Sequence, residues 1–369
     1  MGNLIAHIKN LFSTPPKVKP LDVLNGLEKA DVLFHNLVAE KKVPGLAVTI
    51  LDRGKKVLQK GYGFADLEKR IQVDPKHTVF RIASISKCIT GLALGKMVED
   101  GIVYLDESFY TYVPDYPKKK YDFTLRQLAS HTAGIRGYRG KEFALNQDYS
   151  IQSGIEIFKN DPLFFEPGTS YLYNSFDFVL LSLAMQEASG ISFQHHVKDS
   201  ILMPLGLKNT FPPQKNVSSS LSTTPKINSQ VENKAEFYTK TSLSFKKAVQ
   251  VNNAYKLAGG GYLSTCEDVA QLGQAILERK LLKAATYDEL LTSQIIDGKP
   301  TYYGLGFQVS QDDHGRAFVG HVGSSVGAYT NLFIYPEHHK VVAILINCTD
   351  PKVQIELDLA IDAIFDSKA

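Results

Sequence analysis

The sequence predicts an α/β fold of the segregated (α+β) kind, in which an antiparallel sheet flanked by helices stands beside a mostly helical lobe. Two observations predict this arrangement. Strand-like runs separated by turn residues lie near both ends of the chain, at 45–62 and 303–347, whereas the segment between them has mainly helical periodicity. Strands at both ends with a helical insert imply a sheet built from both termini.

The N-terminal elements are a helix and a hairpin. Residues 21–40 carry apolar side chains at helical spacing. Two strand-like runs follow, at 45–51 and 56–62, and Asp52-Arg53-Gly54 joins them. A short polar connection with glycine between such runs predicts a β-hairpin.

The middle of the chain combines apolar helices with long connections. A polar stretch at 212–249, rich in Ser, Thr, Asn and Lys, is interpreted as a long surface excursion. Helices are expected directly after Ser84 and at 126–130, 175–189 and 267–278.

The C-terminal part returns to strands, and a closing helix follows them. We therefore expect a lead segment at 1–20 and a single domain at 21–369, with an α/β lobe at about 21–82 and 300–369 and a helical lobe at about 83–299. The expected strands are 303–309, 317–321, 328–335 and 340–347, and the expected helix is 353–365.

Ser84-Ile85-Ser86-Lys87 is the first segment that can carry chemistry. Residues three apart on a helix are neighbours, so the Ser84 hydroxyl and the Lys87 amine can face the same small volume. The helix that follows is apolar over much of its circumference, which predicts burial, and a buried lysine tends to lose its proton. Ser84 is therefore a candidate nucleophile with its base close by. The structural alternative is a capping Ser84 and a Lys87 that extends to solvent.

Two further segments add to this candidate site. Tyr173 stands directly before an apolar helix and can present its phenol to a cleft, although a tyrosine at a core edge is commonly structural. The segment 320–327 (Gly-His-Val-Gly-Ser-Ser-Val-Gly) is a glycine-rich strand end, where the backbone of a ligand can approach closely.

Together these segments resemble the serine β-lactamase-like family. That family includes class C β-lactamases, D-alanyl-D-alanine carboxypeptidases, D-amino-acid peptidases, family VIII esterases and a mitochondrial serine β-lactamase-like protein. The resemblance runs from about Val43 to Asn347, and it implies the β-lactamase/transpeptidase-like fold. Three more segments carry it: 125–134 is similar to the family's LLTHTSG segment, 258–268 to its glycine-rich turn before a helix, and 303–307 to its YGLGW strand.

Carried over residue by residue, the resemblance implies a role for each motif. Ser84 is the acylated nucleophile, and Lys87 shares or takes its proton. Tyr173 is the general base for acylation and the acid for the leaving group. The backbone N–H groups of Ser84 and Ser324 form the oxyanion hole.

The sequence departs from the family pattern at two positions. The third motif reads His321-Val322-Gly323 where β-lactamases usually have K-T-G, and a largely neutral imidazole weakens the positive charge that would hold a carboxylate. The second motif has Ser175 where the family has asparagine; the shorter side chain can still hydrogen-bond Lys87 or a substrate amide. Both changes argue against an efficient β-lactamase and favour an ester or peptide substrate.

Other signals compete with this interpretation. The G-x-S-x-G pattern around Ser325 is typical of α/β-hydrolases, but there the serine lies between a strand and a helix, whereas 328–335 predicts a strand. His131, in a helix-ending turn, is interpreted as structural. The pairs His195-His196 and His338-His339 point apart on regular elements, so no metal site is expected. No cofactor motif appears, and no cofactor is expected.

Composition limits the remaining function classes. A formal net charge of +3 and scattered lysines give no argument for nucleic acid or a membrane surface. Three cysteines form no disulfide framework, and no apolar run reaches membrane-spanning length, so we expect a cytoplasmic protein without a transmembrane segment. The oligomeric state cannot be predicted.

The function predicted from these observations is a serine hydrolase that forms an acyl-enzyme on Ser84. Its partners would be small-molecule or peptide substrates with ester, peptide or amide bonds. The alternatives are a D-amino-acid peptidase, a β-lactamase, and a weakly catalytic scaffold or penicillin-binding protein.

Overall fold

The computed structural model describes residues 17–213 and 233–366. Most of the expected lead segment 1–20, and residues 214–232 of the polar excursion at 212–249, lie outside these ranges. Within the described ranges, no helix is long and apolar enough to cross a bilayer.

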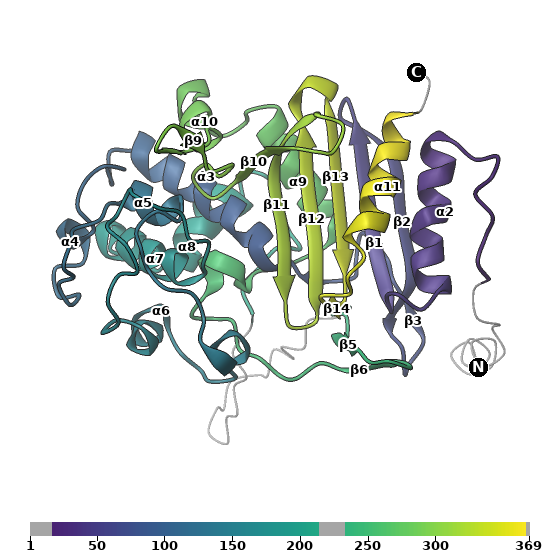
Figure 1. Cartoon of the computed structure of the whole chain (residues 1–369), viewed down its shortest axis with the longest axis horizontal. Coiled ribbons are helices and arrows are strands. Elements are labelled where there is room, and N and C mark those ends of the chain that lie inside the picture. Colours follow the sequence, from purple (N-terminus) through teal and green to yellow (C-terminus); the bar gives the residue numbers. More distant parts are fainter. Residues whose placement is uncertain (1–16, 214–232, 367–369) are drawn as a thin grey trace.

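A seven-stranded antiparallel sheet forms the centre of one half of the molecule (Figure 1). Its order, β10-β11-β12-β13-β1-β2-β3, places strands from the C-terminal part beside strands from the N-terminal part. The expected sheet from both chain ends is confirmed. The strands are β1 (Gly45–Asp52), β2 (Lys55–Asp66), β3 (Ile71–Gln72), β10 (Gln308–Gln311), β11 (Ala317–Ser325), β12 (Ala328–Tyr335) and β13 (Lys340–Ile346).

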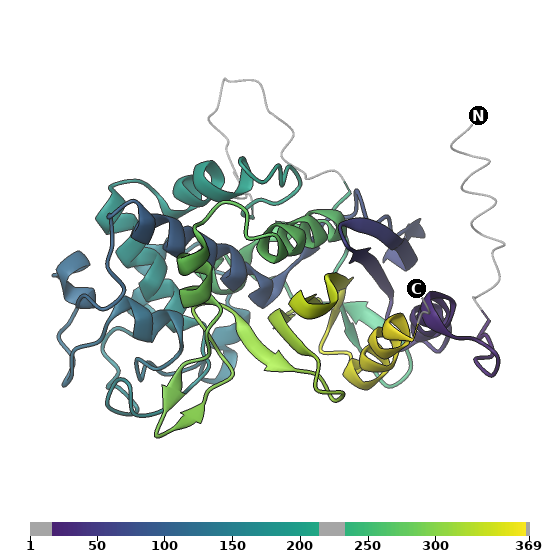
Figure 2. The same cartoon turned by 90° about the horizontal axis from the view of Figure 1, so that it is seen from above.

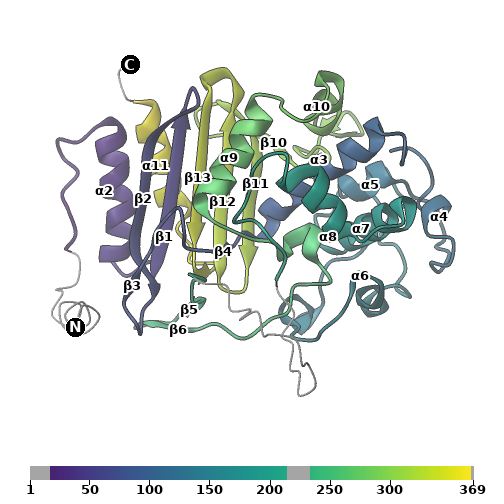
Figure 3. The same ribbon diagram turned by 180° about the vertical axis from the view of Figure 1, so that it is seen from behind.

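Helices cover both faces of this sheet. The helices α2 (Gly26–Ala39) and α11 (Gln354–Phe365) pack against each other on one face, and α9 (Cys266–Leu277) covers the other face (Figures 2 and 3). The central strand β13 contacts both layers: Ile344 packs toward α2 and α11, and Leu345 toward the core that contains α9. Burial on both faces explains why β13 is a continuous apolar run.

The helical lobe is built around α3 (Ser86–Glu99), of which all but three of its 14 residues are buried. The other helices of the middle part are α4 (Phe109–Tyr112), α5 (Leu125–Ala129), α6 (Ile151–Gly154), α7 (Phe176–Ser189), α8 (Phe193–Val197) and α10 (Ala284–Leu290). Short 3₁₀ or π turns lie at Ala83–Ile85, Gly140–Ala144, Ile155–Ile157, Lys198–Leu202, Leu257–Gly261 and Pro336–His338. The remaining strands are β4 (Phe80–Arg81), β5 (Tyr238–Lys240), β6 (Phe245–Lys247), β7 (Leu263–Ser264), β8 (Ile295–Ile296), β9 (Lys299–Pro300) and β14 (Cys348–Thr349).

One expected strand is wrong. The segment 303–309 was predicted to be a strand, but regular pairing begins only at Gln308. Gly306 has a φ of +89°, and its neighbours form a tight turn in which the N–H of Gly304 donates to Phe307 O. The turn packs so closely on α3 that a Cβ at Gly306 would lie 2.6 Å from the carbonyl oxygen of Lys87. Gly304 and Gly306 therefore allow this segment to pack closely behind the site as a turn, and they do not belong to a strand.

Candidate active site

Ser84 lies where the chain turns from β4 into α3. Ala83 has a φ of +47°, a left-handed conformation that residues other than glycine rarely adopt. The short 3₁₀ turn Ala83–Ile85 then leads directly into α3 and leaves Ser84 half-buried. The strained backbone thus presents the Ser84 hydroxyl at the start of a buried helix.

Lys87 is fully buried one turn further along. Its Nζ donates to Ser84 Oγ at 3.3 Å and to the carbonyl oxygen of Gly259 at 2.7 Å. Burial lowers the pKa of the amine to about 7, although the nearby Asp177 acts in the opposite direction. The alternative in which Lys87 extends to solvent is wrong, and about half of the amine is neutral near pH 7.

Tyr173 approaches Ser84 from the turn before α7. Its hydroxyl donates to Ser84 Oγ at 2.7 Å, and its ring lies 4.8 Å from the Lys87 amine. Tyr173 is 39% exposed, but desolvation of its hydroxyl raises the pKa of the phenol above its ordinary value, so the group is neutral at pH 7. The hydroxyl, amine and phenol, which are up to 89 residues apart, therefore meet at one oxygen atom.

The edge of β11 forms the opposite wall. A Cβ at Gly323 would lie 2.9 Å from the backbone nitrogen of Ser84, so only glycine allows this approach. The N–H of Val322 donates to the side chain of Gln308, toward the β10 side of the strand. The N–H of Ser324, two residues on, is expected on the same side of the strand, past the last pair between β10 and β11 at Gly320.

His321 lies in this wall with both ring nitrogens occupied. Nδ1 donates to its own neighbour Val322 O at 2.6 Å, and Nε2 accepts from the Tyr303 hydroxyl at 3.0 Å. Burial and the charge of Lys87 lower the pKa of the imidazole to about 3. The side chain is 1% exposed and neutral, so it presents no positive charge to a substrate.

Ser175 does not hydrogen-bond Lys87 within the described part of the chain. Its hydroxyl is within hydrogen-bonding reach of Tyr138, and the acceptor for Lys87 is the carbonyl of Gly259. Sequence reasoning missed this role of Gly259, although the run of three glycines at 259–261 marked a place of close backbone approach. It also missed Asp177, a buried carboxyl that accepts from His131 at 2.9 Å; an acidic residue within an apolar helix was the signal.

Ser325 lies at the end of β11 and directly before the turn into β12. The element after it is a strand, so the strand–turn–helix setting of an α/β-hydrolase nucleophile is not present at this serine. Among the described residues, no group of three or more His, Cys, Asp or Glu side chains could hold a metal ion.

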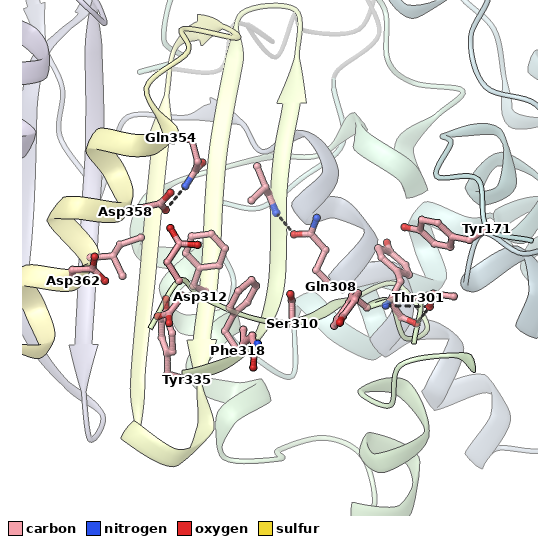
Figure 4. Close-up of a pocket in the computed structure, with 17 residues that line it drawn as sticks. Tyr171, Thr301, Gln308, Ser310, Asp312, Phe318, Tyr335, Gln354, Asp358 and Asp362 are labelled. Carbon is pink, nitrogen blue, oxygen red and sulfur yellow. Dashed lines mark hydrogen bonds between the residues drawn. The ribbon is translucent and has the colours of Figure 1, made fainter. Parts of the chain in front are cut away.

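A pocket of about 380 Å³ lies along the face of the sheet that α11 covers and reaches Tyr303, whose ring centre is 6.0 Å from that of Tyr173 (Figure 4). Tyr303 and Val322 line the end next to the site, and four aspartates, 312, 313, 358 and 362, line the far end. Arg316 neutralises part of this charge through ion pairs with Asp312 and Asp362. Burial and the neighbouring carboxylates nevertheless raise the pKa of Asp358, as expected in a region of net negative potential.

The chain is similar to known proteins in sequence and in fold. A family model described as Beta-lactamase matches residues 30–364. The human "Serine beta-lactamase-like protein LACTB, mitochondrial" is 29% identical over 84% of this chain and 72% of its own length.

Two solved structures share the fold. D-amino acid amidase from Ochrobactrum anthropi SV3 superposes with a TM-score of 0.77 at 20% identity, over 93% of this chain and 99% of that one. EstCE1, "a hydrolase with promiscuous acyltransferase activity", superposes with a TM-score of 0.76 at 19% identity, over 92% and 98%. The β-lactamase/transpeptidase-like fold predicted from the sequence is confirmed.

Proposed function

The chain belongs to the beta-lactamase family, and from this membership we propose that it is a serine hydrolase that forms an acyl-enzyme on Ser84. The observation that carries the proposal is the double contact at Ser84 Oγ, with the Tyr173 hydroxyl at 2.7 Å and the Lys87 amine at 3.3 Å. A hydroxyl held between an amine and a phenol has both a proton acceptor and a proton donor within reach.

In acylation, the neutral Lys87 amine takes the Ser84 proton as the oxygen attacks the substrate carbonyl. This proposal differs from the role that the resemblance implies for Tyr173, because the phenol is protonated at neutral pH and the pKa of Lys87 is lowered to about 7. The N–H groups of Ser84 and Ser324 stabilise the negative charge that develops on the carbonyl oxygen. The Tyr173 phenol gives a proton to the leaving group, and the Lys87 ammonium restores the proton of the phenol. The Lys87 amine is then neutral again. In deacylation, a water molecule attacks the ester of the acyl-enzyme, and the same groups transfer its proton.

The substrate class we propose is small esters or peptide and amide bonds without an essential carboxylate. His321 is neutral where β-lactamases usually have a lysine, and the adjoining pocket ends in carboxylates. Like charges would disfavour an anionic substrate there. The amidase and the hydrolase with acyltransferase activity, whose folds the chain shares, support hydrolysis of amides and esters as the reactions to test.

A substrate panel tests this proposal. A short-chain p-nitrophenyl ester, a D-amino-acid amide and nitrocefin should be hydrolysed in that descending order by the wild type, and Ser84→Ala should abolish turnover of each. Ser325→Ala is the matched control and should retain turnover. If Ser325→Ala abolishes turnover and Ser84→Ala does not, the proposal is wrong.

The division into lobes at about 21–82, 83–299 and 300–369 stays a prediction, and so does the cytoplasmic location. The mitochondrial relative makes a second compartment worth testing. Fractionation of cells that express the full chain would distinguish the two.

A further inference from the structure

A buried acid–imidazole pair lies behind Tyr173. His131 Nδ1 and Asp177 Oδ2 are 2.9 Å apart, and both side chains have no exposed surface. The side-chain amide of Asn174 donates to the same oxygen of Asp177 at 2.6 Å. Desolvation of a buried polar pair costs free energy that its hydrogen bonds must offset, and the reaction outlined above does not use either residue.

The pair is joined to Tyr173 on both sides in sequence. The N–H of Leu172 donates to His131 O at 2.9 Å, and Asn174, on the other side of Tyr173, is anchored to Asp177. The rings of His131 and Tyr173 pack edge to face with their centroids 4.5 Å apart. Among the described residues, the Tyr173 hydroxyl hydrogen-bonds only Ser84, so the direction of the phenol depends on the packing of its ring.

The pair also lies close to Lys87, whose amine is 4.8 Å from the centre of the Tyr173 ring and 5.2 Å from that of Phe178, the residue after Asp177. The hydrogen-bond acceptors of Lys87 are a carbonyl oxygen and a hydroxyl, both uncharged. Burial raises the pKa of the Asp177 carboxyl well above its ordinary value, although Asn174 and Lys87 act in the opposite direction. When it is ionised, Asp177 raises the pKa of Lys87. Lys87 also interacts with Cys88 from its own helix, with His131 from the turn after α5, with His321 from β11 and with Lys256 before the glycine turn.

We propose that His131 and Asp177 are positioning residues of this site: the imidazole holds the Tyr173 ring against Ser84, and the ionised form of the Asp177 carboxyl supplies a negative charge near Lys87. The proposal rests on the proposed function, because it assigns the pair a role through Lys87 and Tyr173. Different variants can remove the two effects separately: the orientation of Tyr173 by His131 and the negative charge of Asp177.

The charge effect is tested with Asp177→Asn, which keeps the shape of the side chain. The protonated Lys87 loses a negative neighbour, so its titration midpoint should fall by about one pH unit, a tenfold loss in proton affinity. Carbon-13 NMR of lysine-labelled protein measures this midpoint without any turnover, and Lys87→Met identifies the signal. Lys119, whose pKa burial lowers and whose amine donates to Asp161 O at 2.9 Å, serves as an internal reference that should not move.

A matched control variant is Asp268→Asn. Asp268 is also a buried carboxyl near a helix start, where it accepts from Asn209 N at 2.7 Å, but it lies on α9. Its removal should lower the melting temperature and leave the Lys87 midpoint in place. A midpoint that is the same in wild type and Asp177→Asn would overturn the proposal.

The orientation effect is tested with His131→Gln, which retains an N–H that can donate to Asp177 but removes the ring beside Tyr173. We expect kcat for the p-nitrophenyl ester to fall at least tenfold with KM and the Lys87 midpoint unchanged. Turnover at the wild-type rate would overturn this half, whether or not Asp177→Asn folds. If the wild type shows no Ser84-dependent turnover but the NMR shift occurs, the proposed function fails and the charge role of Asp177 stands.

Discussion

Ser84 lies between two groups, Lys87 and Tyr173, whose pKa values are shifted in opposite directions from their ordinary values. Burial lowers the pKa of Lys87 to about 7 and raises that of the Tyr173 phenol. The amine is therefore the group whose unprotonated form is populated at neutral pH and can accept a proton, and the phenol remains a donor. This difference explains why one small volume can both remove and return a proton.

Removal of one hydroxyl tests this division of roles. Tyr173→Phe keeps the ring but loses the 2.7 Å hydrogen bond to Ser84, and kcat/KM for an ester should fall by about 10² to 10⁴. Tyr171→Phe is the matched control, because Tyr171 lies on the same segment and its ring lies 6.2 Å from that of His131; it should change kcat/KM less than threefold. Equal losses in both variants would contradict a specific role for the Tyr173 hydroxyl.

At the scale of elements, the site depends on how closely β11 approaches the start of α3. Gly323 provides the space, and the Thr330 hydroxyl of β12 donates to Ile82 O at 3.0 Å, which ties the sheet to the turn before Ser84. The two N–H groups of the proposed oxyanion hole come from these two elements. Their spacing is therefore a property of the packing between the strand and the helix.

Gly323→Ala should separate the two elements slightly. Its Cβ would lie 2.3 Å from the Thr330 hydroxyl and 2.9 Å from Ser84 N, so β11 or the turn must shift. We expect kcat to fall on the order of 10²-fold, the loss that follows displacement of one oxyanion donor, while the fold is retained by circular dichroism. Gly137→Ala, whose Cβ would meet only Asn174 at 3.8 Å, should have little effect. If both variants behave alike, the close approach of β11 is not what limits the reaction.

At the scale of the whole molecule, one sheet holds the two chain ends together. Its central strand β13 is buried between α2 and α11 on one side and α9 on the other. The helical lobe between these ends supplies α3, Tyr173 and the Leu257–Gly261 turn, and the start of α3 packs against β11 of the sheet. The site therefore forms only when distant segments are assembled.

Core truncation on either face of β13 should destabilise the same unit. Ile344→Ala and Leu345→Ala each remove a fully buried side chain and should lower the free energy of unfolding by about 2–5 kcal/mol. Ile355→Ala, at a side chain that is 76% exposed, should change it by less than about 0.5 kcal/mol. Urea denaturation followed by fluorescence and circular dichroism measures this, and loss of only one face's transition would contradict a shared core.

Much of this assembly could be predicted from the sequence because its strongest signals are local. The hairpin at β1 and β2, the helix α7 with its Gly190 end, and the strand β12 follow from alternation, periodicity and turn residues. The turn at 303–307 was mistaken for a strand because close packing against α3 has no local signature. Partners such as Gly259 for Lys87, and Asp177 for His131, are 172 and 46 residues apart, and spacing along the chain gives no distance between them.

Intact-mass spectrometry after exposure to a fluorophosphonate, followed by peptide mapping, tests whether Ser84 is the nucleophile. We expect one added label, located on Ser84, that forms slowly in Lys87→Met and is missing in Ser84→Ala. A label located on Ser325, or one that still forms in Ser84→Ala at the wild-type rate, would contradict this assignment.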